Sequence, residues 1–313
     1  MEPVHVLLAG DRKYSKFLLE GRNKCLLEFQ TGRLLGRTLH ALENAQRVKT
    51  VLVVGPELLG ELIPASLPSK PISLLIQKDS FSENLLAALE WIQHNHPGSP
   101  AVFVTNDAPL LTSEELDEFA QSVVQQPADI NIAVFRTHPI TLADPLVQQY
   151  IRSIVALSDG LFLLANQVSL SAASADLLEA GQKIFDLRKQ SKYGTSLRTF
   201  YYLVREWGSG KNVISWLRLI IAKKVWLMVP KSSLNSWVGI SLGEIEMRLG
   251  RAIGQKLRLR ITEIPNAFGA FDADTPSQLK ELRSVVEQQE ARIMDVGVDE
   301  SIKPWEANYA GVA

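Results

Sequence analysis

The sequence predicts an α/β fold, with a mostly parallel central sheet, helices on both faces and a helical insertion. Through the first half of the chain, short apolar runs alternate with segments whose apolar residues recur at three- and four-residue steps. The chain has 313 residues and is 46% hydrophobic, which is enough to fill a sizeable core. Its single cysteine, Cys25, excludes an internal disulfide and a zinc cluster and fits a reducing compartment.

Six apolar runs are expected to form the strands of this sheet. Each is short and apolar, as strands covered by helices on both faces usually are. The last run alternates apolar and polar residues, which indicates a half-buried strand that returns to the sheet. The expected strands are residues 4–9, 50–54, 72–76, 101–105, 130–135 and 257–264.

Helices are expected between and after these strands. Two crossover helices follow from apolar residues at helical spacing, and Ser113 is expected to cap the N-terminus of a third. In the last predicted helix, Leu279, Leu282 and Val286 lie on one face. The expected helices are residues 34–42, residues 85–92, a helix that begins at Ser113, residues 171–184 and residues 275–290.

The domain organisation follows from a change in pattern after residue 185. Residues 1–185 and 251–290 are predicted to form the α/β core. Residues 186–250, rich in Leu, Ile, Trp and Tyr, are predicted to form the helical insertion, and residues 291–313 a loosely packed C-terminal tail.

The insertion allows two interpretations. The segment from Trp216 to Leu227 combines large apolar residues with Arg218, Lys223 and Lys224, a composition that interfacial membrane helices share. Apolar residues occur nearly all around this segment, which favours helices packed on the core or on another subunit of a homo-oligomer. Membrane contact through the insertion is therefore the alternative to internal packing.

The bulk charge limits the partners. The formal net charge of −1 provides no general field that attracts nucleic acid, so any affinity for phosphate must be local. No apolar stretch reaches membrane-spanning length, and the N-terminus lacks a secretory pattern. We therefore expect a soluble cytoplasmic protein without a nucleic-acid partner.

Three segments carry the chemistry, and each follows a predicted strand. In open α/β sheets, ligands bind beyond the carboxyl ends of the strands. Gly10 can offer backbone N–H groups to phosphate oxygens. Lys24 and Arg12 are expected on the β- and γ-phosphates, with Arg22 as further positive charge that stabilises a leaving pyrophosphate.

Asp107 and Asp274 supply the anionic half of the predicted site. A nucleoside triphosphate brings Mg²⁺, a hard ion that usually takes one or two protein carboxylates. The predicted reaction moves a nucleoside monophosphate from this triphosphate to a small phosphorylated acceptor. An anionic acceptor needs no protein base, and the five histidines stand in no triad or metal-ligand spacing.

Four motifs resemble those of the MobA-like nucleotidyltransferases, a group related to sugar-nucleotide pyrophosphorylases and to the guanylyltransferase that matures molybdenum cofactor. The motifs are Leu8-Ala9-Gly10-Asp11, Lys24-Cys25-Leu26-Leu27, Thr105 to Thr112, and Asp272 to Leu279. Their order and spacing match this family over nearly the whole chain outside the insertion. The resemblance implies a nucleotide-diphospho-sugar transferase-like fold and a nucleotidyltransferase activity.

The resemblance also implies roles for individual residues. It assigns Mg²⁺ to Asp107 and Asp274, with Asp272 as an outer candidate. Ser82 and Asn84 correspond to a helix start near the nucleobase, although a helix cap is the structural alternative for both. The expected nucleotide-binding residues are Ala9, Gly10, Asp11, Arg22, Ser82 and Asn84.

The acceptor side is predicted less sharply. Asn166 ends an apolar run where relatives place a substrate-facing polar residue, with a turn residue as the alternative. Arg188 and Lys189 could clamp the acceptor phosphate, with a solvated helix face as the alternative. The insertion has no counterpart in the small guanylyltransferases, so the resemblance does not identify the acceptor.

Two other functions stay open. The first is a glycosyltransferase that uses a nucleotide-sugar donor on a similar sheet; such enzymes place paired acids after the mid-chain strand, where this chain has Asn106-Asp107. The second is an inactive relative that binds nucleotide to regulate a partner. Asp11 and the helical insertion favour that alternative, and Asp11 does so because it puts a negative side chain where the family has a second Gly beside the phosphates.

Overall fold

The computed structural model describes most of the predicted α/β core. The described residues are 1–10, 19–20, 23–29, 32–63, 66–67, 69–137, 145–151, 153–174, 221, 239–252, 257–265 and 268–295. Every structural statement below concerns these residues.

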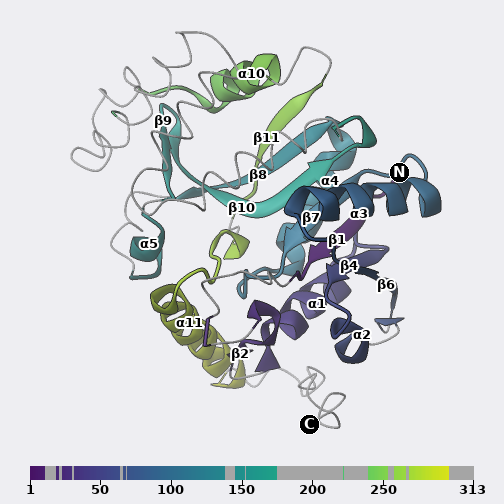
Figure 1. Ribbon diagram of the computed structural model, residues 1–313. Helices are drawn as coiled ribbons and strands as arrows, with labels where there is room; N and C mark the ends of the chain where they lie inside the picture. Colours follow the sequence, from purple (N-terminus) through teal and green to yellow (C-terminus); the bar gives the residue numbers. More distant parts are fainter. Residues whose placement is uncertain are drawn as a thin grey trace.

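Within them, nine strands form one sheet, in the order β11-β8-β10-β7-β1-β4-β6-β5, with β9 paired to β10 (Figure 1). The pairs among β7, β1, β4 and β6 are parallel, as is β11 with β8, whereas β10 runs antiparallel to both β7 and β8. This confirms the predicted fold class. The strands are β1 (Val4–Leu8), β4 (Val51–Gly55), β5 (Ser66–Leu67), β6 (Lys70–Ile76), β7 (Ala101–Thr105), β8 (Ile130–Thr137), β9 (Val155–Leu157), β10 (Gly160–Leu170) and β11 (Leu259–Glu263).

All six predicted strands occur, and β10 is the long strand that the sequence analysis missed. Its first four residues are all buried, so they lack the alternation of a half-buried strand, and a bulge shifts its register against β8 between Leu164 and Val168. Asn166 lies inside this bulge with a φ of 54°, a left-handed conformation that Asn tolerates better than most residues. The apolar run that Asn166 ends is thus the first part of a longer strand, which continues to Leu170.

Helices cover both faces of the parallel strands. One face packs against α1 (Leu34–Asn44) and α4 (Ser113–Gln125), whose buried leucines join Leu7, Val53 and Val104. The other face packs against α3 (Phe81–Asn95). The remaining helical elements are η1 (Lys24–Leu26), α2 (Leu59–Leu62), α5 (Pro145–Tyr150), η3 (Ala172–Ser174), α10 (Leu242–Ala252), η4 (Phe268–Ala270) and α11 (Pro276–Asp295).

One predicted helix start needs correction. The N-cap of α4 is Thr112 rather than Ser113, because the Thr112 side chain accepts a hydrogen bond from the backbone N–H of Glu115. The last predicted helix is confirmed as α11, in which Leu279, Leu282 and Val286 are buried on one face. This face packs against Phe271 and the side chains of α5.

Helix α10 runs across residue 250, where the predicted insertion ends, and it lies beside β11 (Figure 1). Its Leu242 and Ile245 pack against Val134 and Phe162 of the sheet. The segment from Trp216 to Leu227 lies outside the described residues except for Ile221, so its packing stays a prediction. No helix among the described residues is long and apolar enough to cross a membrane.

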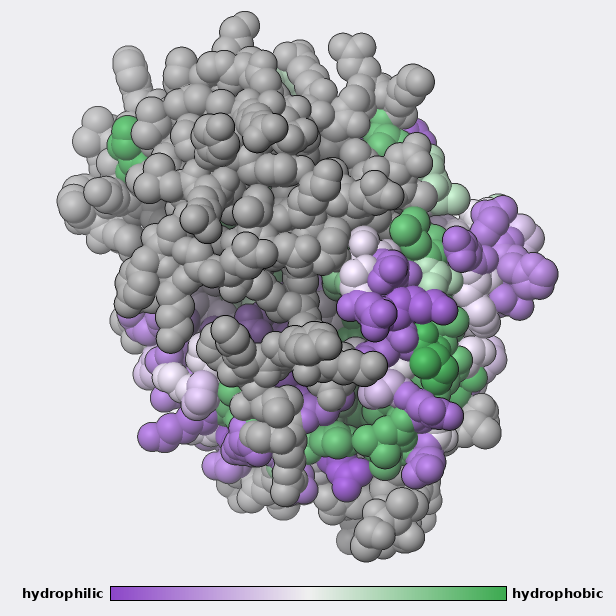
Figure 2. Space-filling view, in the orientation of Figure 1, coloured by the Kyte–Doolittle hydropathy of each residue, from purple (hydrophilic) through white to green (hydrophobic). Residues whose placement is uncertain are grey.

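Hydrophilic and hydrophobic residues are interspersed over the described part of the face that Figure 2 shows.

A second, separate sheet of two strands consists of β2 (Glu28–Phe29) and β3 (Gly32–Arg33). It lies beside α11 (Figure 1), where the Arg283 side chain donates to the carbonyl oxygen of Glu28. This contact ties the C-terminal helix to the N-terminal part of the chain.

Candidate functional site

The site begins where β1 and β7 end side by side. Leu8 is in register with Thr105, so the segments that follow these strands start at the same edge of the sheet. The backbone N–H of Asn106 donates to the carbonyl oxygen of Leu8 at 3.2 Å. Asp107 therefore leaves the sheet next to Ala9 and Gly10, as expected of parallel neighbours.

Lys24 reaches this edge through the short helix η1. The Asn23 side chain caps η1 by accepting from the backbone N–H of Cys25 at 2.9 Å. Cys25 is buried, and its Sγ donates to the carbonyl oxygen of Ala9 at 3.0 Å. These contacts fix Lys24 beside the end of β1, and they give the only cysteine of the sequence a packing role.

The motif from Asp272 to Leu279, here called the late motif, lies at the same edge of the sheet although it is far from β1 and β7 in the sequence. The backbone N–H of Ala273 donates to the carbonyl oxygen of Asp107 at 2.8 Å. The hydroxyl of Tyr150 donates to the carbonyl oxygen of Asp272. The two residues on either side of Ala273 are thereby held next to Asp107, and α11 starts immediately afterwards at Pro276.

Lys24 and three carboxylates form the centre of the site. Lys24 Nζ lies 2.9 Å from Asp107 Oδ2 and 2.5 Å from Asp274 Oδ1. One carboxylate oxygen from each of Asp107, Asp272 and Asp274 lies within 4.8 Å of the others. Residues that are distant in the sequence thus meet in one cluster, and Asp272 belongs to it as fully as the two expected aspartates.

The charges in this cluster perturb one another. Burial raises the pKa of Asp272 to about 7, and the nearby charges of Asp274 and Asp107 add to the effect. Burial alone would lower the pKa of Lys24, but its two carboxylate partners more than offset this and raise it. Three acidic groups so close together favour a bound cation, and carboxylate oxygens are ligands that Mg²⁺ prefers.

Comparison with known families identifies the chain. The model of the MobA-like NTP transferase domain matches residues 6–182, which is more than half of the sequence. The chain belongs to this family. It is therefore a nucleotidyltransferase, and the predicted membership of this family is confirmed.

Solved structures share the fold of this MobA-like transferase. A hypothetical transferase from Thermus thermophilus is 21% identical with a TM-score of 0.59, and the match covers 89% of this chain and all of that one. A CMP:2-keto-3-deoxy-manno-octonic acid synthetase complexed with CTP is 11% identical with a TM-score of 0.52, and the match covers 92% of this chain and all of that one. A comparison with curated proteins found no match.

The predicted nucleotide-binding residues lie in two places. Ala9 is buried and Gly10 is exposed at the end of β1, next to the cluster. Ser82 and Asn84 lie in the first turn of α3, which the Ser80 side chain caps together with Glu83. Asn84 Oδ1 accepts from the backbone N–H of Lys78 at 2.6 Å, so this side chain organises the loop before the helix. Arg12, Asp11 and Arg22 lie outside the described residues.

On the acceptor side, the structure describes only Asn166. Its side chain donates to the carbonyl oxygen of Gly269 at 3.0 Å, just before the late motif. Asn166 therefore contacts the turn that leads to Asp272. Arg188 and Lys189 lie outside the described residues, and their role stays a prediction.

Sequence analysis did not identify three residues that support the site: Tyr150, Gly269 and Glu115. Tyr150 contacts Asp272 of the late motif, and Gly269 lies in the turn before this motif. The Glu115 carboxylate accepts from the backbone N–H of Gly269. In the sequence, Glu115 is one of two adjacent acids at a helix start, and only the fold shows which of them points inward.

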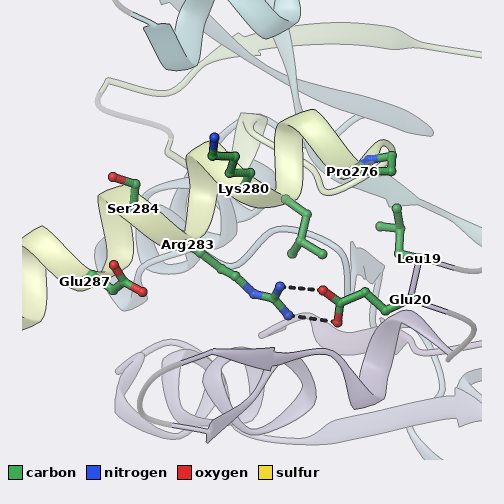
Figure 3. A pocket seen from close by; sticks show the side chains of 8 residues that line it. Leu19, Glu20, Pro276, Lys280, Arg283, Ser284 and Glu287 are labelled. Atoms are coloured by element: carbon green, nitrogen blue, oxygen red, sulfur yellow. Dashed lines mark hydrogen bonds and ion pairs between the residues drawn. The ribbon is translucent and has the colours of Figure 1, made fainter.

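A cleft of about 470 Å³ lies along α11 (Figure 3). The lining includes Pro276, which is two residues from Asp274, and Leu19 and Glu20 on the opposite wall. Arg283 crosses it and forms two hydrogen bonds with the Glu20 carboxylate, at 2.5 and 3.0 Å. This ion pair holds Glu20 against α11, on the side of Asp274.

Proposed function

We propose that this protein transfers a nucleoside monophosphate from a nucleoside triphosphate to a small phosphorylated acceptor and releases pyrophosphate. The observation that supports this best is the convergence of Lys24, Asp107 and Asp274 at the carboxyl ends of β1 and β7. The family assignment supports nucleotidyl transfer in general, and the cluster supports this particular division of roles.

Asp107 and Asp274 would hold the metal ion, with Asp272 beside them. The residues fit a hard divalent cation, because three carboxylate oxygens lie within 4.8 Å of one another. Burial, with the like charges of Asp274 and Asp107, raises the pKa of Asp272, and a bound cation would offset this repulsion. The bound ion would neutralise negative charge on the phosphates of the substrate.

Lys24 would bind the β- and γ-phosphates of the triphosphate. In the reaction, an acceptor phosphate oxygen forms a bond to the α-phosphorus, and the bond from that phosphorus to the bridging oxygen of the β-phosphate breaks. The electron pair leaves with pyrophosphate, whose developing charge an ammonium group stabilises. The acceptor oxygen is already anionic, so no proton has to be removed, and catalysis depends on positioning and electrostatics.

The first test is a thermal-shift panel with the four ribonucleoside triphosphates, each with and without Mg²⁺. A ligand at about a hundred times its dissociation constant raises the free energy of unfolding by roughly 2.7 kcal/mol. The triphosphate that shifts the transition is then incubated with phosphorylated acceptors, and pyrophosphate release is measured. A panel in which no triphosphate shifts the transition would contradict the proposal.

The same assay separates the two alternatives. A glycosyltransferase would release a nucleoside diphosphate from a nucleotide sugar and no pyrophosphate. An inactive regulatory relative would bind a triphosphate without turnover. Mg²⁺-dependent pyrophosphate release that disappears in Asp107→Ala would exclude both of them.

A further inference from the structure

The turn that leads into the late aspartates is fastened from three directions. The turn is η4 (Phe268–Ala270), which precedes Asp272 by two residues. Gly269 donates its backbone N–H to Glu115 and accepts from Asn166 through its carbonyl oxygen. Farther along, Tyr150 holds the carbonyl oxygen of Asp272. The supporting side chains come from α4, β10 and α5.

Glu115 is the unusual member of this group. It lies in the first turn of α4 and is only 2% exposed. Acidic side chains are rarely so buried unless a partner group contacts them. Its Oε1 and Oε2 lie 3.2 and 3.0 Å from the backbone nitrogen of Gly269. Burial raises its pKa to about 8, against the opposing effect of the hydrogen bonds from Gly269 and Phe268. The carboxyl group is therefore mostly protonated at neutral pH.

Gly269 fits this contact because it has no side chain. A Cβ at this position would lie 2.8 Å from Glu115 Oε2 and 2.8 Å from Leu111 Cδ1. Real Cβ atoms essentially never come so close to other heavy atoms, so in an alanine variant the Glu115 carboxyl group and the end of the Leu111 side chain, or the turn itself, would have to move. The Gly269 backbone can thus lie this close to the Glu115 carboxyl group because position 269 has no side chain.

The opposite side of Gly269 is held by a strained residue. Asn166 has a φ of 54° within the bulge of β10, and its side chain donates to the carbonyl oxygen of Gly269 at 3.0 Å. A left-handed conformation costs free energy for a residue other than glycine. Gly269 is therefore clamped between a buried carboxyl group and the amide of a bulge residue.

We propose that Glu115 is a positioning residue, which acts through Gly269 to fix how Asp272 and Asp274 face Asp107. This inference rests on the proposed function, since it concerns the geometry of the proposed metal ligands. The contacts described for Glu115 are with the turn rather than with Lys24 or the aspartates. Its effect on the cluster must then pass through the backbone from Gly269 to Asp272.

The experiment compares three variants of the full chain: Glu115→Ala, Glu115→Gln and Glu118→Ala. Gln has nearly the shape of a protonated Glu and keeps an oxygen that accepts from Gly269. Glu118 is an exposed acid on the same helix and serves as the matched control. Two quantities are measured: amide hydrogen exchange in the peptide that covers residues 268–275, and the affinity for Mn²⁺ by electron paramagnetic resonance of the free ion.

Glu115→Ala is expected to speed exchange in that peptide at least about tenfold, because it removes the acceptor of the backbone N–H groups of Gly269 and Phe268. It is also expected to weaken Mn²⁺ binding about tenfold, as the loss of a residue that orients metal ligands usually does. Glu115→Gln should stay within about twofold of the wild-type protein in both quantities. Glu118→Ala should change neither of them.

Several outcomes would overturn the inference. One is faster exchange in Glu115→Ala with unchanged Mn²⁺ affinity, which would make Glu115 a fold-supporting residue only. Another is a Glu115→Gln variant as impaired as Glu115→Ala. If Glu115→Ala does not fold, Gly269→Ala tests the same contact with the carboxyl group intact, and wild-type affinity in that variant would also contradict the inference.

Failure of the proposed function would look different. In that case the wild-type protein would bind no Mn²⁺ and no triphosphate would shift its thermal transition. The exchange measurement would still report whether Glu115 holds the turn, so the two failures can be told apart.

Discussion

Asp107 and Asp274 belong to one cluster, yet the protein holds them in different ways. Asp107 follows a buried strand of the parallel half of the sheet, and the backbone of its neighbour Asn106 is bonded to β1. Asp274 follows a short turn that no strand continues, and hydrogen bonds from side chains of other elements support this turn. The Asp107 side chain is 23% exposed and that of Asp274 is 51% exposed. We call the half that the sheet backbone fixes the rigid half, and the half that side chains of other elements hold the adjustable half, because single side-chain substitutions can alter it.

Replacing Asp107 should have the largest effect. Asp107→Ala removes the more buried carboxylate, whose charge water screens less, and we expect pyrophosphate release to fall on the order of 10³-fold. Asp274→Ala should cost less, on the order of 10²-fold. Both are measured with the triphosphate that the thermal-shift panel identifies. Equal losses, or a larger loss at Asp274, would contradict the division into two halves.

Lys24 joins the halves, and its removal should separate binding from catalysis. Lys24→Met should lower pyrophosphate release on the order of 10²-fold, because the leaving pyrophosphate loses an ammonium group. In the absence of nucleotide, the same variant should bind Mn²⁺ about two- to tenfold more tightly, since partly exposed ion pairs of this kind contribute modestly. Lys24→Arg is the control that keeps the charge.

Weaker Mn²⁺ binding in Lys24→Met would argue against this account. It would mean that Lys24 orders the carboxylates of Asp107 and Asp274 for the metal ion, rather than competing with the ion for them.

The adjustable half should also respond to pH through Glu115. Its pKa is about 8 in the folded protein against an ordinary value of 4.5, so the folded state binds more protons than the unfolded state between these values. Stability from this group is complete below the lower value and is lost as pH rises toward the higher one, by about 1.4 kcal/mol per pH unit. Above about pH 8 the loss is complete.

Urea unfolding of the wild-type protein and Glu115→Gln at about pH 5.5 and about pH 7.5 measures this difference. The advantage of the Gln variant should grow with pH. Glu114 and Glu118 raise the pKa of Glu115 through their charges and are present in both proteins, so the difference isolates Glu115. A constant difference between the proteins would show that the Glu115 carboxyl group titrates normally.

The rigid half could be predicted from the sequence, because its information is local. A buried strand that ends at Gly10, and another that ends before Asp107, place both residues at one edge of a parallel sheet. Lys24 was expected at the phosphates from its charge and its place in the sequence, and the contact of Cys25 with Ala9 shows how the fold brings it there. Local pattern and tertiary contact agree here.

The adjustable half could be predicted only in part. The motif pointed to Asp274, but nothing in the sequence showed that Asn166 supports a turn or that Glu115 is the inward acid of its pair. Strand β10 was missed because its first four residues are all buried and do not show the alternation on which strand prediction relies. Hydrogen bonds between residues more than a hundred positions apart leave no periodic signal in one sequence.

Tyr150→Phe should have the smallest effect on Mn²⁺ binding, and it tests directly whether the two halves of the site are independent. The variant keeps the ring, which packs edge-on against Phe271 with centroids 5.1 Å apart, and removes only the hydroxyl that donates to the carbonyl oxygen of Asp272. A single neutral hydrogen bond is worth about 0.5–1.5 kcal/mol, so Mn²⁺ affinity should fall about two- to tenfold. Isothermal titration with Mn²⁺ measures it. Since Asp107 does not depend on this hydroxyl, amide exchange at the ends of β1 and β7 should remain that of the wild-type protein. Faster exchange there as well would mean that the two halves loosen together, and that the site is one mechanical unit.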